Sequence, residues 1–128
     1  MFLTVDADDK RPLYQQIADG IKSLIASGDL LEGAALPSVR QVAGDLGVNL
    51  NTIAVAYRQL QEEGFVTVRH GSGAVVSSMR ARKTGHDEVL RPLRAALTDM
   101  VLAGFDDREI AAAVRQELAS LRQKGDSR

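Results

Sequence analysis

The sequence contains no cysteine, so it holds neither a disulfide framework nor a thiolate metal site, which fits a reducing compartment. It also lacks any apolar run close to the roughly 18 residues that a membrane-spanning helix requires. Its first residues have neither the basic start nor the long apolar stretch of a secretory signal. We therefore expect a cytoplasmic protein with no membrane partner.

The sequence has no excess of positive charge. Its formal net charge is −1, and residues 1–80 carry seven Lys or Arg against nine Asp or Glu. Nucleic-acid-binding proteins usually present a basic surface, so a DNA-binding function has to depend on where individual basic residues lie. The apolar share of 45% is enough for a hydrophobic core. The length of 128 residues suits one domain, or a small domain with an appendage.

Residues suited to catalysis or metal binding are scarce. His70 and His86 have no acidic or histidine partner at metal-ligand spacing. Ser72 lacks the strand and helix context that makes a nucleophile elbow. The sequence therefore predicts neither an enzyme nor a bound cofactor.

Apolar residues recur every three or four positions in three segments of the first half, which is the spacing of one helix face. Pro12 and Gly28 bound the first predicted helix, and Ser38 and Gly47 bound the second. The third predicted helix, Asn49–Glu63, begins two positions after Gly47. Two short helices joined by a tight glycine-containing turn predict a helix-turn-helix.

A β-hairpin is predicted directly after these helices. In "FVTVRHGSGAVV", apolar and β-branched residues flank a short glycine-rich segment that can reverse the chain. A two-stranded ribbon is marginally stable alone, so we expect it to pack on the helices as a wing. The predicted fold class is mainly α with a small β-hairpin, a winged helix-turn-helix over residues 1–78.

The remainder predicts a linker at residues 79–86 and a helical hairpin at residues 87–128. Pro92 either bends the first of these two helices or lies near its start. Two helices of this length cannot enclose a ligand pocket of several hundred Å³, so their apolar stripes favour packing against a second subunit. The predicted dimer-interface residues are Leu93, Leu97, Val101, Ile110, Val114 and Leu118.

The third helix carries three small uncharged polar residues on its leading turn. Asn49 is placed to cap the helix. Asn51 and Thr52 are mediocre helix formers, so their presence in the first turn asks for a reason. The N-terminal residues of a recognition helix contact base edges in the major groove, and asparagine can pair with adenine. Capping alone, with no partner, remains the alternative.

Basic residues occur where a winged helix would meet phosphates. Arg40 lies near the start of the second helix, where it can contact a phosphate or form a surface ion pair with Asp45 or Glu32. Arg69 and His70 lie at the tip of the predicted hairpin, from which a wing reaches phosphates or the minor groove.

The segment from Pro12 to Val76 closely resembles the GntR family of bacterial transcription regulators, above all in "LPSVRQVAGDLGV", "NTIAVAYRQL" and the glycine-bearing wing. The tail from Leu90 to about Leu121 is similar to that of the YtrA-type subfamily. The resemblance implies a homodimer that binds an inverted repeat in a double-stranded DNA operator, usually as a repressor. It also implies that the tail helices form the dimer interface.

The resemblance places DNA contacts on the second helix, the start of the third helix, and the wing. Relatives often have basic residues at the positions of Ala54 and Val55, and proline or arginine at that of Leu50. All three are apolar here, which shifts readout towards other residues and leaves Leu50 free to touch a thymine methyl. The predicted DNA-binding residues are Arg40, Asn49, Leu50, Asn51, Thr52, Arg58, Arg69, His70 and Gly71, with the wing spanning Arg69–Gly73.

Two other functions stay open. The apolar positions on the third helix and the acidic balance are compatible with a winged-helix protein-interaction module that binds no specific DNA. The family's responses to metabolites are compatible with an effector-gated sensor, although no residue in the sequence indicates a small-molecule effector.

Overall fold

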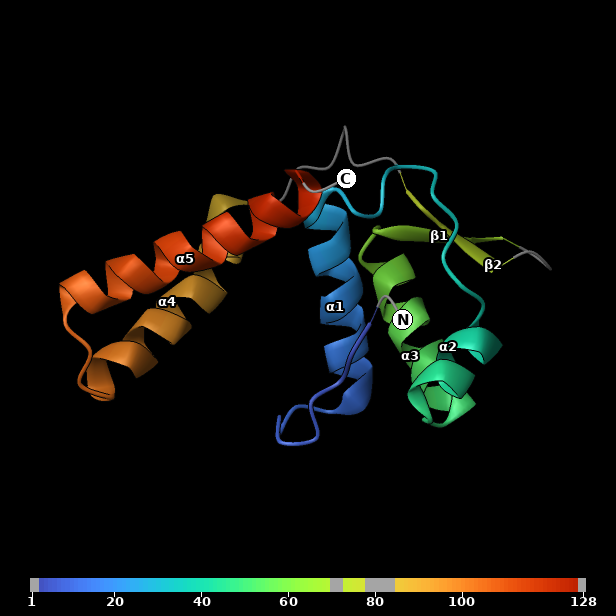
Figure 1. The fold of residues 1–128 in the computed structure, drawn as a ribbon, viewed down its shortest axis with the longest axis horizontal. Coiled ribbons are helices and arrows are strands. Elements are labelled where there is room, and N and C mark those ends of the chain that lie inside the picture. Colours follow the sequence, from blue (N-terminus) through green and yellow to red (C-terminus); the bar gives the residue numbers. More distant parts are fainter. Residues whose placement is uncertain (1–2, 70–72, 78–84, 127–128) are drawn as a thin grey trace.

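The computed structural model describes residues 3–69, 73–77 and 85–126 of the chain. Within these ranges it has five helices and one antiparallel two-stranded hairpin, which confirms the predicted fold class (Figure 1). The elements are α1 (Leu13–Ser27), α2 (Val39–Leu46), α3 (Leu50–Glu62), β1 (Val66–Arg69), β2 (Gly73–Val76), α4 (His86–Leu102) and α5 (Asp107–Asp126).

Helix α1 packs along α3 and supplies much of the core. Ile17 and Ile21 are fully buried, whereas Leu13 of the same predicted face is 38% exposed. The extended N-terminal segment also packs on α1, because Leu3 is buried against it. Gly20 permits this approach, since a Cβ at that position would lie 2.7 Å from a terminal carbon of Leu3.

Helices α2 and α3 form the predicted helix-turn-helix. The Ser38 hydroxyl caps α2 by accepting a hydrogen bond from the Gln41 N–H at 3.0 Å. Gly47 ends α2 with a φ of 69°, a left-handed conformation that glycine adopts without strain. The Asn49 side chain then caps α3 by accepting a hydrogen bond from the Asn51 N–H at 2.7 Å. Both predicted caps are confirmed.

The hairpin formed by β1 and β2 is anchored to the segment that precedes α2. Val66 pairs with Val76, and Ala35 forms an isolated bridge with Val75. The Leu36 N–H donates to the Ala74 carbonyl at 2.8 Å on the same side. The hairpin is therefore held by backbone hydrogen bonds as well as by its buried side chains, as a marginal ribbon requires.

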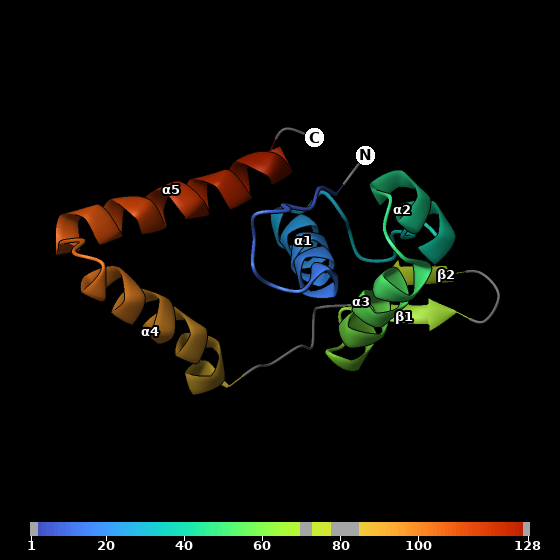
Figure 2. The ribbon, with the colours of Figure 1, turned by 90° about the horizontal axis from the view of Figure 1, so that it is seen from below.

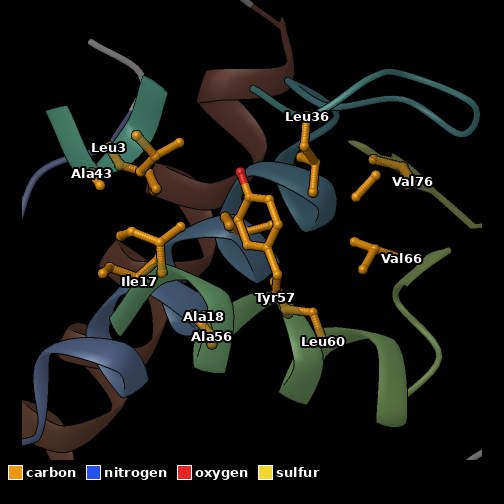
Figure 3. Packing of buried hydrophobic residues seen from close by; sticks show 14 residues of the cluster. Leu3, Ile17, Ala18, Leu36, Ala43, Ala56, Tyr57, Leu60, Val66 and Val76 are labelled. Atoms are coloured by element: carbon orange, nitrogen blue, oxygen red, sulfur yellow. The ribbon is translucent and has the colours of Figure 1, made fainter. Parts of the chain in front are cut away.

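One hydrophobic core joins all these elements. The inward face of α3, formed by Ile53, Ala56, Tyr57 and Leu60, is buried as its spacing predicts. Side chains from α1, α2, both strands and the Leu36 segment surround it (Figure 3). Full burial of an isoleucine or leucine side chain contributes about 1.5–3 kcal/mol, so this face fixes the orientation of α3.

The tail consists of α4 and α5. Pro92 lies inside α4, which begins at His86, so the alternative that placed Pro92 near the helix start is wrong. Asp106 and Glu109 form a capping box at the start of α5: the Asp106 carboxylate accepts from the Glu109 N–H at 2.8 Å, and the Glu109 carboxylate accepts from the Asp106 N–H at 2.9 Å.

The apolar sides of α4 and α5 line an open groove of about 280 Å³. Leu93 and Leu118 on its walls are 45% and 47% exposed, so the two helices alone do not bury their stripes. The C-terminal part of α5 lies beside α1, which connects the tail to the winged helix (Figures 1 and 2). Among the described residues, no helix is long and apolar enough to cross a membrane.

Candidate nucleic-acid interface

The outward side of α3 carries the residues that we define as the reading face: Leu50, Asn51, Ala54, Val55 and Arg58. Asn51 and Arg58 are exposed, Leu50 is 48% exposed, and Ala54 and Val55 are partly exposed. Burial of the opposite side in the core leaves this face available to a partner. Thr52 is half-buried at the flank of the same turn.

The two asparagines of the leading turn have different roles. Asn49 uses its side-chain oxygen to cap the helix. Asn51 is exposed, and its side-chain amide makes no hydrogen bond within the described part of the chain. A free amide can donate and accept at once, which is the requirement for pairing with adenine.

Arg40 and Arg58 provide unpaired positive charge. Both side chains are exposed, and within residues 3–69, 73–77 and 85–126 neither forms an ion pair. The alternative in which Arg40 pairs with Asp45 or Glu32 is therefore wrong. Both guanidinium groups are free to contact phosphate or a base edge.

Other basic residues of the winged helix are paired internally. Arg11 forms an ion pair with Asp9 at 2.7 Å. Lys22 forms one with Glu63 at 2.6 Å, and its ammonium group also lies 5.2 Å from the centre of the Phe65 ring. Pairing therefore neutralises Arg11 and Lys22, whereas Arg40 and Arg58 keep unmatched charge within the described residues.

A hydrogen bond connects the leading end of α2 to α3. The Tyr57 hydroxyl donates to the Pro37 carbonyl at 2.6 Å, and the ring is 5% exposed. Figure 3 shows this ring pointing towards the Leu36 segment. Burial raises the pKa of Tyr57 to about 12, so the phenol stays protonated and keeps donating. The bond sets the position of Ser38 and Arg40 relative to α3.

An apolar hollow of about 300 Å³ lies between the start of α2, the middle of α3 and the hairpin. Val39, Ala54, Tyr57 and Val68 form part of its wall, with Arg58 also among the lining residues. Sequence spacing did not predict this hollow, because it brings together three segments that are distant along the chain. It shows that the reading face and the hairpin belong to one continuous surface.

The wing is described only at its base. Arg69 ends β1 and pairs with Gly73, but its side chain, together with His70 and Gly71, lies outside the described residues. Their predicted DNA contacts therefore stay predictions. Among the described residues, no group of three or more histidine, aspartate or glutamate side chains could hold a metal ion.

The chain is similar in sequence and in fold to known proteins. Residues 13–76 match the sequence pattern of the family described as "Bacterial regulatory proteins, gntR family". The chain belongs to the GntR family. It is 35% identical to the transcriptional repressor YtrA of Bacillus subtilis over 59% of this chain and 58% of that protein.

Several solved structures resemble the chain, among them a YtrA protein and an AraR domain. YtrA of Sulfolobus acidocaldarius, a GntR-family transcription factor, is 38% identical, with a TM-score of 0.63 over 77% of this chain and 99% of that one. The DNA-binding domain of AraR, solved in complex with its operator ORE1, is 25% identical, with a TM-score of 0.52 over 60% of this chain and 94% of that one. This GntR-family chain is accordingly a DNA-binding transcriptional regulator and not an enzyme.

We expect Tyr57→Phe to lower the free energy of unfolding by about 1 kcal/mol, because the Pro37 carbonyl loses its donor. The raised pKa of Tyr57 also makes the free energy of unfolding depend on pH. Above the unfolded-state value of 10 the unfolded chain loses the phenolic proton while the folded chain keeps it up to about 12, so stability falls with rising pH in that window.

Urea denaturation between pH 8 and 11.5 measures both effects. Tyr57→Phe should flatten the alkaline decline, whereas Tyr14→Phe, a matched change at a half-buried tyrosine of α1, should retain it. Equal slopes for wild type and Tyr57→Phe would contradict this account of the hydrogen bond.

Proposed function

We propose that the protein is a homodimeric repressor that binds an inverted-repeat operator, with the reading face of α3 in the major groove and the wing at the backbone or minor groove. The observation that carries this proposal concerns three exposed side chains of α2 and α3: within the described residues, the Asn51 amide makes no hydrogen bond, and Arg40 and Arg58 form no ion pair. An amide reads base edges, and guanidinium groups hold phosphates. A cytoplasmic location follows, since bacterial operators lie there.

The relatives support the DNA-bound arrangement. The AraR domain was solved on its operator, and the Bacillus relative is named as a repressor. We propose that this chain likewise binds an operator and acts as a repressor. The unpaired arginines fit it, because phosphate contacts position a protein on DNA, while Asn51 supplies a group able to distinguish bases.

The tail supports the homodimer. Leu97 and Val114 line the open groove between α4 and α5, whose wall is almost entirely apolar. Exposed apolar stripes of this kind mark interaction surfaces, and a second copy offers a complementary pair of helices. Two reading faces on one DNA side would then be spaced by roughly 34 Å or a multiple.

Two substitutions distinguish base reading from phosphate binding. Asn51→Ala should cost about 1–3 kcal/mol of discrimination at one base pair of each half-site. Arg40→Ala should weaken binding to all sequences and lower the slope of log K against log salt by about one per protomer. Fluorescence anisotropy against cognate and single-mismatch duplexes at several salt concentrations measures both quantities.

Lys10→Ala is the charge-matched control for Arg40→Ala, because Lys10 is an exposed cation that precedes α1 and lies outside the helix-turn-helix. Lys10→Ala should change base discrimination less than Asn51→Ala does, and it should change the salt slope less than Arg40→Ala does. In an adaptor protein without specific DNA binding, neither Arg40→Ala nor Asn51→Ala would change DNA affinity or base discrimination. That result would reject the proposal.

The double substitution Leu97→Asp/Val114→Asp should produce monomers with much weaker operator affinity, because two charges would enter the apolar groove. Thr98→Asp/Gln116→Asp adds the same charges at exposed neighbouring positions that do not line the groove, and it should remain dimeric. Sedimentation equilibrium gives the oligomeric state. A dimer in the first variant would place the interface elsewhere.

A further inference from the structure

The reading face has an exposed apolar strip that folding does not explain. Leu50 is the first residue of α3 and is 48% exposed, although exposed positions at helix starts are suited to polar residues. It belongs neither to the buried core nor to the partly buried residues that pack against that core. Ala54 follows one helical turn later on the same side.

The strip continues into the apolar hollow. Ala54 is one of the hollow's lining residues, together with Val39, Val68 and Ala74. The wall of the hollow is mostly apolar, and Ser38, Arg58 and Gln61 supply its polar groups. Any DNA that contacts Asn51 therefore also meets the exposed apolar side chain of Leu50, the residue directly before it.

The chemistry of the major groove restricts what this strip can face. Guanine, adenine and thymine present hydrogen-bond acceptors there, adenine and cytosine present amino donors, and thymine alone presents a methyl group, beside its O4 acceptor. A leucine side chain against a donor or acceptor would remove water without replacing its hydrogen bond, which is unfavourable. Against a methyl group, burial of both surfaces is favourable.

We propose that Leu50, with Ala54 one turn later, contacts thymine C5-methyl groups in each operator half-site and makes the protein select thymine there. This inference rests on the proposed placement of α3 in the major groove. Leu50 precedes Asn51 directly, so the thymine contact and the adenine-type contact fall on the same few base pairs. The leading turn therefore selects A·T pairs through two independent groups, one apolar and one polar.

The expected effect can be stated for a single methyl group. Removing one buried methyl changes Kd by about fourfold, and the same change in both half-sites of a dimer multiplies to about fifteenfold. Deoxyuridine differs from thymidine only by this methyl. Replacement of thymine by deoxyuridine therefore isolates the proposed contact without altering base pairing.

The experiment uses the full chain and a pool of random-sequence DNA duplexes, from which a preferred sequence is selected by repeated binding. Each thymine of the selected duplex is then replaced by deoxyuridine, symmetrically in the two half-sites, and Kd is measured by fluorescence anisotropy. Wild type, Leu50→Ala and Leu50→Met are compared. Leu31→Ala, at a leucine that is 59% exposed in the loop after α1, is the matched control.

For wild type and Leu31→Ala, we expect at least one symmetric replacement to raise Kd by about fifteenfold. Leu50→Ala should bind the thymine and deoxyuridine duplexes with equal affinity at that position, and Leu50→Met should retain a preference, since methionine restores an apolar contact. Selected half-sites without thymine, or equal deoxyuridine sensitivity in wild type and Leu50→Ala, would overturn the thymine contact alone. Failure of wild type to enrich any sequence would overturn specific DNA binding itself, and this inference with it.

Discussion

The burial of one face of α3 determines what the rest of the molecule can do. Ile53, Ala56, Tyr57 and Leu60 are enclosed by α1, α2 and the hairpin, so α3 cannot rotate without exposing a large apolar surface. The opposite face is thereby presented outward in one fixed orientation. Preorganisation of this kind reduces the entropy lost when a rigid helix enters a groove.

Two polar contacts extend this fixed orientation to neighbouring groups. The bond from Tyr57 to the Pro37 carbonyl holds the start of α2, where Arg40 lies, and the backbone bonds of the Leu36 segment hold the hairpin. Lys22 and Arg11 are already matched by carboxylates, whereas Arg40 and Arg58 have no ion-pair partner in the part of the chain that the structure describes. The positions of these two arginines, and not the net charge of the chain, supply the positive groups near α3.

Much of the fold could be predicted from the sequence because its signals are local. The caps at Ser38 and Asn49 and the inward face of α3 follow from residue type and spacing, and the structure confirms them. The burial of Leu3 on Gly20, the Tyr57 bond and the apolar hollow could not be predicted, because each joins residues that are distant in sequence. Within the candidate site, the exposure of Asn51 could be predicted from its place opposite the buried face of α3. That Arg40 has no ion-pair partner among the described residues could be seen only in the three-dimensional structure.

Recognition of a particular DNA sequence by the reading face of α3 can be measured by fluorescence anisotropy. The titration uses DNA from upstream of the protein's own gene beside a scrambled duplex, each at two salt concentrations. We expect tight binding to the native duplex only, weakening as salt rises because phosphate contacts contribute. Absence of binding to this duplex and to every fragment of a genomic pool would contradict this recognition and favour a protein-interaction module.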